Sequence, residues 1–387
     1  MAEYVRLGDV CTVISGSTPK SNIPEYWDGD VIWITPAELN ESSYIIRDSI
    51  RHITTKAVSD TSLRSFPAGT VILSSRAPIG KTAIAGCEMY CNQGFKNLIC
   101  SSRINNKYLY CFLSCKTDYL NSLGRGATFK EISKNIVEDI IIPLPEISEQ
   151  KKIAAKFEHI RNVKQNYERQ RELLDELIKS RFIELFGDPV DNEMQWPTKS
   201  LEEACRVIVD CPHSTPNYTS QNTGFMCIRT SIVKKNYIIW DDIEFISEEE
   251  YNKRIQRKKP EKGDVIYTRE GAILGIAAVI DKECNVALGQ RAMLLSPDAN
   301  QCNSIFLCNA MNCDSFLANA LKGQSGSASP HINVGDIKAF KMIMPPIKLQ
   351  QQFAAFVAQV DKSKFVVQKS LQELETLKKS LMQQYFG

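Results

Sequence analysis

The residues of this sequence that could do chemistry are cationic and hydrogen-bonding side chains in loops. Arginine, glutamine, asparagine and threonine are the side chains that read base edges in nucleic acids, and lysine contacts phosphates. Such side chains occur in both halves of the 387-residue chain. The candidate nucleic-acid contacts are Ser17, Thr18, Lys20, Arg76, Lys81, Lys96, Arg125, Thr128 and Lys130 in the first half, and His213, Arg229, Thr230, Arg254, Arg257, Lys258, Lys259, Arg269, Arg291, Gln324, Ser325 and His331 in the second.

The most basic local run is KRIQRKK, at residues 253–259. A charge run is also typical of an ordinary solvated face, so a nucleic-acid contact and a solvated face both stay open for this segment. The formal net charge of the chain is only +2, and the charge is zero over residues 1–147 and −3 over residues 188–347. Composition therefore carries no strong basic signal, and a case for DNA must rest on local clusters or on family resemblance.

No set of catalytic residues can be assembled from the sequence. Gly80-Lys81-Thr82 has the ending of a phosphate-binding loop, but Ser75 stands where the first glycine of that loop belongs. The motifs HExxH, GxSxG and GxGxxG are absent, as is the Asn/Asp-Pro-Pro-aromatic signature of adenine methyltransferases. An enzyme with an unrecognised active site is a disfavoured alternative, and we expect a non-catalytic protein without a cofactor.

The thirteen cysteines predict a reduced, cytoplasmic protein. They form no CxxC pair, and no histidine stands at zinc-finger spacing from the CxxxC pairs Cys87/Cys91 and Cys111/Cys115. We therefore expect core thiols and neither a disulfide nor a metal site. The first residues lack an apolar export signal, and no apolar run approaches the ~20 residues of a membrane helix.

The elements that must position the candidate residues occur twice. A shift of 200 positions superposes the segment from Pro145 to Gly187 on the segment from Pro345 to Gly387, with Gln150 on Gln350 among the matches. Each half of the chain is thus predicted to be a globular segment followed by a long helix.

Alternating and apolar runs predict the elements inside each globular segment. Strands are expected at residues 11–14, 31–34, 70–74, 82–85 and 140–142, and a helix at residues 108–123. In the second half, Gly263-Asp264-Val265-Ile266 corresponds to residues 69–72, Arg269 corresponds to Arg76, and Gly289-Gln290 corresponds to residues 92–93. The matched residues are mostly glycines and core aliphatics, which indicates one fold presenting two different surfaces.

The two long helices carry imperfect coiled-coil seams. Lysine stands at the same seam position in both, where it either disfavours other registers or only extends along the seam edge. A helix of about forty residues cannot bury its seam on its own small domain, so the two helices are expected to pair, either parallel or antiparallel. The seam residues are Ile153, Phe157, Ile160, Lys164, Tyr167, Arg171, Leu174, Ile178, Arg181 and Leu185, and Phe353, Val357, Val360, Lys364, Val367, Leu371, Leu374, Lys378, Leu381 and Tyr385.

The helix ends resemble those of the specificity subunits of type I restriction–modification systems. LPEISEQKKIA, at residues 144–154, is similar to the family's helix entry, and FGDP, at residues 186–189, is similar to its helix exit. Residues 7–10 and 263–266 resemble family strand signals. The second helix entry departs from the pattern, because Gln351 and Phe353 stand where lysine and isoleucine are usual.

The resemblance implies an α+β fold with an internal pseudo-two-fold repeat. Two similar target recognition domains, each a mixed β-sheet with helices, would each be followed by a long conserved helix, and the helices would form an antiparallel coiled coil. The expected segments are residues 1–147 for the first recognition domain, 148–187 for the central helix, 188–347 for the second recognition domain and 348–387 for the C-terminal helix.

The resemblance also implies a function. Each recognition domain would read one half of a bipartite, asymmetric site on double-stranded DNA, and the coiled coil would set the spacer and dock two modification subunits. Restriction subunits would join through the complex, and catalysis would belong to these partners. The alternative is an interaction scaffold of two domains on a coiled-coil stalk without a DNA role, which the near-neutral globular segments favour.

Overall fold

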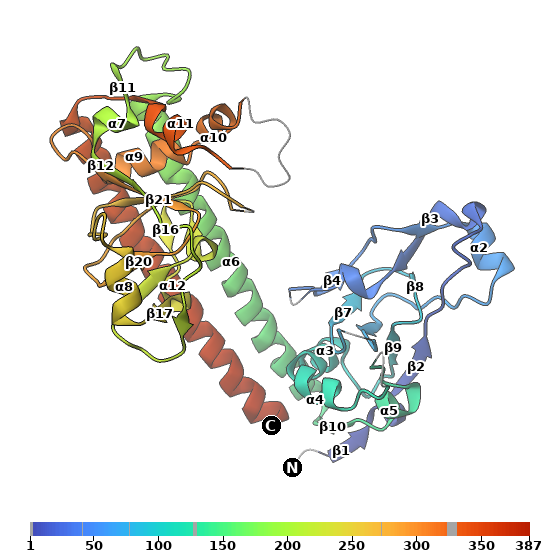
Figure 1. Cartoon of the computed structure of the whole chain (residues 1–387). Coiled ribbons are helices and arrows are strands. Elements are labelled where there is room, and N and C mark those ends of the chain that lie inside the picture. The colour runs from blue at the N-terminus through green and yellow to red at the C-terminus, as the bar shows by residue number, and fades with distance from the viewer. Residues whose placement is uncertain (1–2, 41, 77, 127–129, 272, 323–330) are drawn as a thin grey trace. The chain divides into compact units, whose positions relative to one another are not determined.

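The computed structural model describes residues 3–40, 42–76, 78–126, 130–271, 273–322 and 331–387 (Figure 1). The chain forms two compact units, here called unit 1 (Met1–Glu168 with Lys369–Gly387) and unit 2 (Arg169–Gln368). Both long helices, α6 (Ile147–Phe186) and α12 (Ile347–Phe386), contribute one part to each unit. The four-segment domain division made from the sequence stays a prediction.

The strands of unit 1 form a larger sheet, a smaller sheet and a two-stranded ribbon. The strands at Val71–Leu73 and Thr82–Ala85 are buried throughout, whereas the strand that begins at Cys11 alternates buried Cys11 and Val13 with exposed Thr12. The larger sheet has the order β2 (Cys11–Ser15), β9 (Lys96–Cys100), β6 (Val71–Leu73), β7 (Thr82–Ala85), β4 (Ile45–Ile46); the smaller has β5 (His52–Ile53), β3 (Trp27–Ile34), β8 (Tyr90–Cys91); the ribbon pairs β1 (Glu3–Arg6) with β10 (Ile141–Leu144).

Two sequence predictions for unit 1 are wrong. The expected helix at residues 108–123 is two helices, α3 (Asn106–Cys115) and α4 (Thr117–Ser122), because Lys116 leaves helical geometry with φ −108° and ψ 21°. The expected strand signal at residues 7–10 is the one-turn helix α1 (Leu7–Val10), because the Asp9 carboxylate accepts the Arg6 N–H at 3.2 Å. The remaining helices of unit 1 are η1 (Pro24–Tyr26), η2 (Pro36–Glu38), α2 (Thr55–Asp60) and α5 (Lys134–Glu138).

Unit 2 repeats this arrangement. Its sheets have the orders β12 (Cys205–Asp210), β21 (Ala292–Pro297), β18 (Val265–Thr268), β19 (Ala277–Val279), and β13 (Tyr218–Thr219), β17 (Glu244–Ile246), β14 (Met226–Ile228), β20 (Val286–Leu288); ribbons join β11 (Thr198–Ser200) to β22 (Lys341–Ile343) and β15 (Val233–Lys234) to β16 (Tyr237–Ile238). Its helices are α7 (Leu201–Ala204), η3 (Thr230–Ile232), η4 (Trp240–Asp242), α8 (Glu248–Arg254), α9 (Ser304–Met311), α10 (Asp314–Ala320) and α11 (Val334–Ala339). The predicted α+β repeat is therefore confirmed.

Backbone hydrogen bonds identify the equivalent positions of the two units. The Ile132 N–H donates to the Ser75 carbonyl at 2.9 Å, and the Ile332 N–H donates to the Arg269 carbonyl at 2.9 Å. Ser75 is therefore the equivalent of Arg269. The pairing of Arg76 with Arg269 from the sequence was wrong by one residue, because the shift of 194 positions that takes Gly69 to Gly263 takes Ser75, and not Arg76, to Arg269.

Two buried glutamines explain the repeated helix-entry motif. The Gln150 amide donates to the Pro145 carbonyl at 2.8 Å, and its oxygen accepts the Asn105 N–H at 2.8 Å. Gln350 makes the same contacts, donating to the Pro345 carbonyl at 2.8 Å and accepting an N–H at 2.8 Å from the residue before α9. Both glutamines have no exposed surface, so each fastens the start of its long helix to its own globular half.

The two long helices run antiparallel within each unit. In unit 1 the Phe157 ring stacks on Phe386, with ring centroids 5.9 Å apart. In unit 2 the Phe182 ring meets Phe353 edge-on, with centroids 5.5 Å apart. The predicted seam positions Arg181, Leu185 and Tyr385 are displaced by one residue, because Phe182, Phe186 and Phe386 are the buried ones.

The seam lysines pair with acidic residues of the facing helix. Lys164 lies 2.6 Å from Glu375 in unit 1, and Lys364 lies 2.6 Å from Asp175 in unit 2. The two pairs occupy equivalent positions under the 200-residue shift. Both lysines keep exposed surface, so they extend along the seam edge, and their pairing with carboxylates also favours the antiparallel register.

Candidate nucleic-acid interface

Two candidate cations of unit 1, Arg76 and Lys96, meet at the carboxylate of Glu131. The Arg76 Nε donates to Glu131 Oε2 at 2.9 Å, and the Lys96 Nζ donates to Oε1 at 3.1 Å. The Lys96 side chain is 8% exposed and also donates to Ser75 Oγ at 3.3 Å, whereas Arg76 is 45% exposed. One carboxylate therefore neutralises a buried lysine and orients an exposed arginine.

The ionisation of Glu131 depends on these two cations. Burial raises the pKa of the Glu131 carboxyl, but the hydrogen bonds from Arg76 and Lys96 outweigh burial and hold the pKa below its usual value. Glu131 is therefore an anion at neutral pH, and it keeps the Arg76 side chain in a defined orientation.

Arg125 and Lys130 border this cluster. Arg125 exchanges backbone hydrogen bonds with Glu131 at 3.0 and 2.9 Å. Both cations are exposed, and none of the residues that the structure describes forms an ion pair with either. They are available to bind an anion from solution.

The loop after β2 lies at the same end of the larger sheet, because Ser15 pairs with Lys96 across β2 and β9. Ser17 donates its N–H to the Cys91 carbonyl at 3.0 Å, and the Thr18 hydroxyl donates to Gln93. The loop is thus fastened to the segment between β8 and β9. Thr18 and Lys20 are exposed, whereas Lys81 is half-buried and its Nζ donates to the Pro36 carbonyl at 3.5 Å.

Two candidate residues of unit 2, Arg269 and His213, contact the carboxylate of Asp210, the last residue of β12. The Arg269 guanidinium donates to both Asp210 oxygens, at 2.9 and 3.2 Å, and it also pairs with Glu270 at 2.8 Å. Its side chain is 6% exposed. The exposed His213 ring lies 3.1 Å from the same Asp210 carboxylate. Arg269 is therefore a fully paired internal cation.

Arg291 and His331 flank this ion-pair cluster. The Arg291 carbonyl accepts the Arg269 N–H at 3.0 Å, and His331 forms a β-bridge with Glu270. Both Arg291 and His331 are exposed. Arg291 has φ +69°, a left-handed conformation that an arginine rarely adopts. The backbone at Arg291 is thus held by the surrounding strands.

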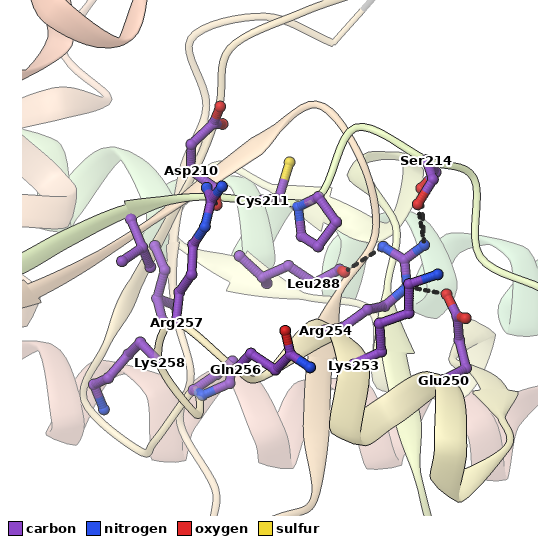
Figure 2. Close-up of a pocket in the computed structure, with 14 residues that line it drawn as sticks. Asp210, Cys211, Ser214, Glu250, Lys253, Arg254, Gln256, Arg257, Lys258 and Leu288 are labelled. Atoms are coloured by element: carbon purple, nitrogen blue, oxygen red, sulfur yellow. Dashed lines mark hydrogen bonds and ion pairs between the residues drawn. The ribbon is translucent and has the colours of Figure 1, made fainter.

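Arg254, at the end of α8, fastens the loop that carries His213. Its Nε donates to Glu250 at 2.6 Å, one terminal nitrogen donates to the Leu288 carbonyl at 3.3 Å, and the other donates to the Ser214 carbonyl at 2.8 Å. Figure 2 shows the guanidinium between Ser214 and Glu250. The side chain is 1% exposed, so Arg254 positions its neighbours from inside the unit.

A hollow of about 220 Å³ opens between this loop and the segment after α8 (Figure 2). Lys253, Gln256 and Arg257 line the hollow and are exposed, and Arg257 also donates to the Asp210 carbonyl at 3.3 Å. Among the described residues, none forms an ion pair with Lys253, Arg257 or Lys259. Lys258 differs, because it pairs with Glu261 at 2.8 Å. In the basic run, Arg254 is thus a buried structural residue, whereas Lys253, Arg257 and Lys259 are exposed cations.

Arg229 and Thr230 belong to a different part of unit 2. Arg229 follows β14, in the sheet that does not contain β12; it pairs with Glu244 at 3.1 Å and lies 5.8 Å from the centre of the Tyr218 ring. The structure gives no contact between these two residues and the Asp210 cluster in the described part of the chain. Thr128, Gln324 and Ser325 fall outside the described residues.

Sequence reasoning missed the acidic residues that organise both clusters, Glu131 and Asp210. Asp210 ends an apolar run and Glu131 precedes a core isoleucine, but neither signal distinguishes an organising carboxylate from a surface one. Lys253 and Gln256 were noted in the basic run without being selected, and only the hollow beside them singles them out.

Across the described residues, no group of three or more histidine, cysteine, aspartate or glutamate side chains could hold a metal ion. In the same part of the chain, no helix combines the length and the hydropathy of a membrane span.

Comparison with known proteins identifies the family. The model of the type I restriction modification DNA specificity domain matches residues 2–174 and 194–376. The chain is 30% identical to the type I restriction enzyme MjaIX specificity subunit of Methanocaldococcus jannaschii, over 97% of this chain and 90% of the relative, and 23% identical to the MjaVIII specificity subunit of the same organism, over 98% and 91%.

Solved structures agree on the fold. The type I restriction–modification S subunit from M. genitalium superposes with a TM-score of 0.56 at 15% identity, covering 100% of this chain and 96% of that one. A chain from a study of complex assembly and conformational transition of the type I R-M system superposes with a TM-score of 0.62 at 19% identity, covering 99% and 97%. Because the specificity-domain model matches both halves, and a 30% identical relative aligns along nearly the whole chain, this protein belongs to the family of type I restriction–modification DNA specificity subunits.

Proposed function

We propose that this protein is the DNA-recognition subunit of a type I restriction–modification complex, in which each half of the chain reads one half of a bipartite, asymmetric DNA site. The observation that carries the proposal is the repetition of one scaffold with different side chains at equivalent positions. Arg76 bridges to Glu131 in unit 1, and Glu270 bridges to His331 at the same place in unit 2. Different donors and acceptors on one backbone suit two different base sequences.

The exposed cations make the DNA contacts in this proposal. They are Arg76, Arg125 and Lys130 in unit 1, and Lys253, Arg257 and Arg291 in unit 2. The buried Lys96, Arg254 and Arg269 position the loops instead, because their charged groups lie inside the unit and are held there by hydrogen bonds to their neighbours. The other candidate residues from the sequence, including Thr128, Gln324 and Ser325, remain in the proposed interface.

The hollow beside α8 is a phosphate site in this proposal. Lys253 and Arg257 supply two exposed positive charges without a carboxylate partner among the described residues, and Gln256 adds a neutral hydrogen-bonding group. Contacts to phosphates fix the position of a protein on DNA without reading sequence. The hollow therefore contributes affinity, and the flanking loops contribute selectivity.

The paired helices α6 and α12 set the distance between the two half-sites and dock the partner subunits. This assignment uses the predicted segments 1–147 and 188–347 as recognition domains and 148–187 and 348–387 as helices. The repeat supplies two equivalent docking surfaces, one for each of two modification subunits, and restriction subunits join through the complex. Catalysis belongs to those partners, and the protein acts in the cytoplasm, where bacterial and archaeal DNA lies.

The alternative of a scaffold without a DNA role is not favoured, because the matching family model describes a DNA specificity domain.

A domain exchange tests the two-reader arrangement. Residues 1–147 are replaced by the corresponding segment of a relative with a different target, and the methylated sequence is determined with the modification subunit present. We expect one half-site to change and the other to stay. A change in both half-sites would refute the assignment of one half-site to each half of the chain.

Helix length tests the spacer. One heptad is inserted into α6 after Glu168 and one into α12 before Lys369, so that the antiparallel seam keeps its register. The spacer of the recognised site should lengthen while both half-sites stay unchanged. An unaltered spacer would remove the helices from the measuring role.

Charge removal tests the phosphate site. The variant Lys253→Gln/Arg257→Gln should lower DNA affinity equally for all target sequences and reduce the slope of log affinity against log salt by about 2, because each phosphate contact contributes ~0.9. The control, Arg206→Gln/Lys341→Gln, removes two exposed cations of unit 2 that lie outside the hollow. An unchanged salt slope in the first variant, or equal effects in both, would make residues 253–259 a solvated face.

A further inference from the structure

Cys11 and Cys100 face each other across strands β2 and β9 of unit 1. The Cys11 N–H donates to the Leu7 carbonyl, and the Ser101 N–H donates to the Val10 carbonyl at 2.9 Å, so the backbones of the two cysteines do not bond to each other. They are therefore a non-hydrogen-bonded antiparallel pair, in which the Cα atoms lie ~4.5 Å apart and the side chains are closest. This spacing lies within the ~4.4–6.8 Å range of disulfide-linked Cα atoms.

The two thiols differ in access to solvent. Cys11 is 6% exposed and packs in the core of unit 1, whereas Cys100 is half-buried at its edge. The hydrogen bond between the two thiols, in which Cys11 keeps its proton, raises the pKa of Cys11 well above its ordinary value, and burial raises it further. Both are free thiols. Cys100 is thus the thiol that a small oxidant reaches first, and Cys11 lies beside it to resolve the product.

We propose that Cys11 and Cys100 form an oxidation site, which closes to an intramolecular disulfide by exchange with a low-molecular-weight disulfide such as oxidised glutathione. The Cys100 thiol loses its proton to solvent and its sulfur attacks one glutathione sulfur, releasing one glutathione thiolate. The Cys11 thiol then loses its proton and attacks the Cys100 sulfur, releasing the second. Two protein thiols are oxidised, and one glutathione disulfide is reduced to two thiols.

The second half of the chain supplies a built-in contrast. Cys205 in β12 is the equivalent of Cys11 in β2, but the residue opposite it in β21 is Pro297. The cross-strand cysteine pair of β2 and β9 therefore has no counterpart at this position of β12 and β21. Closing the disulfide would join the ends of β2 and β9 and restrict the unfolded chain between residues 11 and 100, which stabilises unit 1.

Peptide mapping of the full-length protein tests the site. The protein is treated with oxidised glutathione, remaining thiols are alkylated, and the chain is cut with trypsin. Peptides 7–20 and 97–103 each contain one cysteine, so a linked product of the two identifies the bond without ambiguity. We expect this linked product, and we expect it to disappear on reduction. The thermal unfolding midpoint of unit 1, measured by hydrogen exchange of that unit, should rise by about 5–10 °C.

Matched variants complete the test. Cys100→Ser should abolish the linked product and the thermal shift, whereas Cys115→Ser, which changes another half-buried cysteine of unit 1, should preserve both. The proposal is overturned if peptides 7–20 and 97–103 stay fully alkylated under oxidation, or if either peptide is linked to a different cysteine instead.

Discussion

The ion-pair clusters of the two units solve one structural problem with different residues. In unit 1 the buried cation is Lys96 on β9, and its carboxylate is Glu131. In unit 2 the buried cation is Arg269, beyond the end of β18, and its carboxylate is Asp210 on β12. The equivalent of Lys96 in unit 2 is the apolar Met293, as the strand registers show.

The comparison separates what the scaffold requires from what it permits. Backbone bonds at Ser75 and Arg269 are the same, and so are the buried Gln150 and Gln350. The charged residues around these shared contacts stand on different strands in the two units, but each buried cation is paired with a carboxylate. Surface chemistry can therefore change without loss of the fold, which a pair of readers with different targets needs.

The largest expected effect contrasts the two buried cations. Arg269→Met should destabilise unit 2 by about 3–5 kcal/mol, because it leaves the Asp210 carboxylate, whose side chain is 15% exposed, with only the exposed His213 ring beside it. Lys96→Met should cost unit 1 only about 1–2 kcal/mol, because Glu131 keeps Arg76 and methionine occupies the equivalent position in unit 2. Hydrogen exchange of β18 and β6 measures each cost separately, and equal costs would contradict the contrast.

In contrast to the two buried cations, the buried glutamines Gln150 and Gln350 should contribute equally to the stability of their units. Gln150→Leu and Gln350→Leu should each destabilise their own unit by about 2–4 kcal/mol, because a buried N–H and buried carbonyls lose their partners. Hydrogen exchange of α3 and α9 provides the readout. Gln165→Leu, on a solvent-accessible part of α6, is the control and should cost little. Unequal costs for the two buried glutamines would show that the helix entries are not energetically equivalent.

Arginine truncation sharpens the difference between the surfaces. Arg76→Ala should weaken binding by about 1–2 kcal/mol for sites carrying the correct first half-site, and Arg291→Ala should do the same for the second. Binding is measured with the modification subunit, on targets altered in one half-site at a time. If either variant relaxed selectivity in both half-sites, the surfaces would not read DNA independently.

The smallest expected effect is the loss of stability of each unit at acid pH. The folded-state pKa of Glu131 is lowered, so its contribution to the stability of unit 1 is complete above the unfolded pKa of ~4.3 and is lost as pH falls through the folded value. Asp314 in unit 2 has a pKa of about 2, because Lys235 and Lys179 donate to it, so its contribution persists to lower pH. Each effect should stay below ~1 kcal/mol, because both carboxylates are solvated.

Urea unfolding followed as a function of pH, with hydrogen exchange to separate the units, checks these windows. Glu131→Gln should reduce the loss of stability of unit 1 at acid pH and leave the pH dependence of unit 2 unchanged. Asp314→Asn should have the opposite effect. If either variant changed the pH dependence of the other unit instead, the assignment of these two carboxylates to the acid sensitivity of their own units would be wrong.

Much of the fold was predictable from local patterns. The strands at residues 11–14, 31–34 and 82–85 and both long helices follow from apolar runs and the repeat, and the structure confirms them. The break at Lys116 was not predictable, because apolar spacing continues through it and only packing of α4 places the turn there. The helix turn at Leu7 was hidden by its short length, which carries no periodicity.

The sequence by itself determined the duplication, the long helices with their repeated glutamines, and the family, because repeats and helix-entry motifs are local and can be read residue by residue. Tertiary structure alone decided which cations are internal supports and which are exposed. Glu131 stands 55 residues from Arg76, and Asp210 stands 59 residues from Arg269. Ion pairs over such separations are set by how the strands pack, so no local pattern could distinguish the buried Arg254 from the exposed Lys253 beside it.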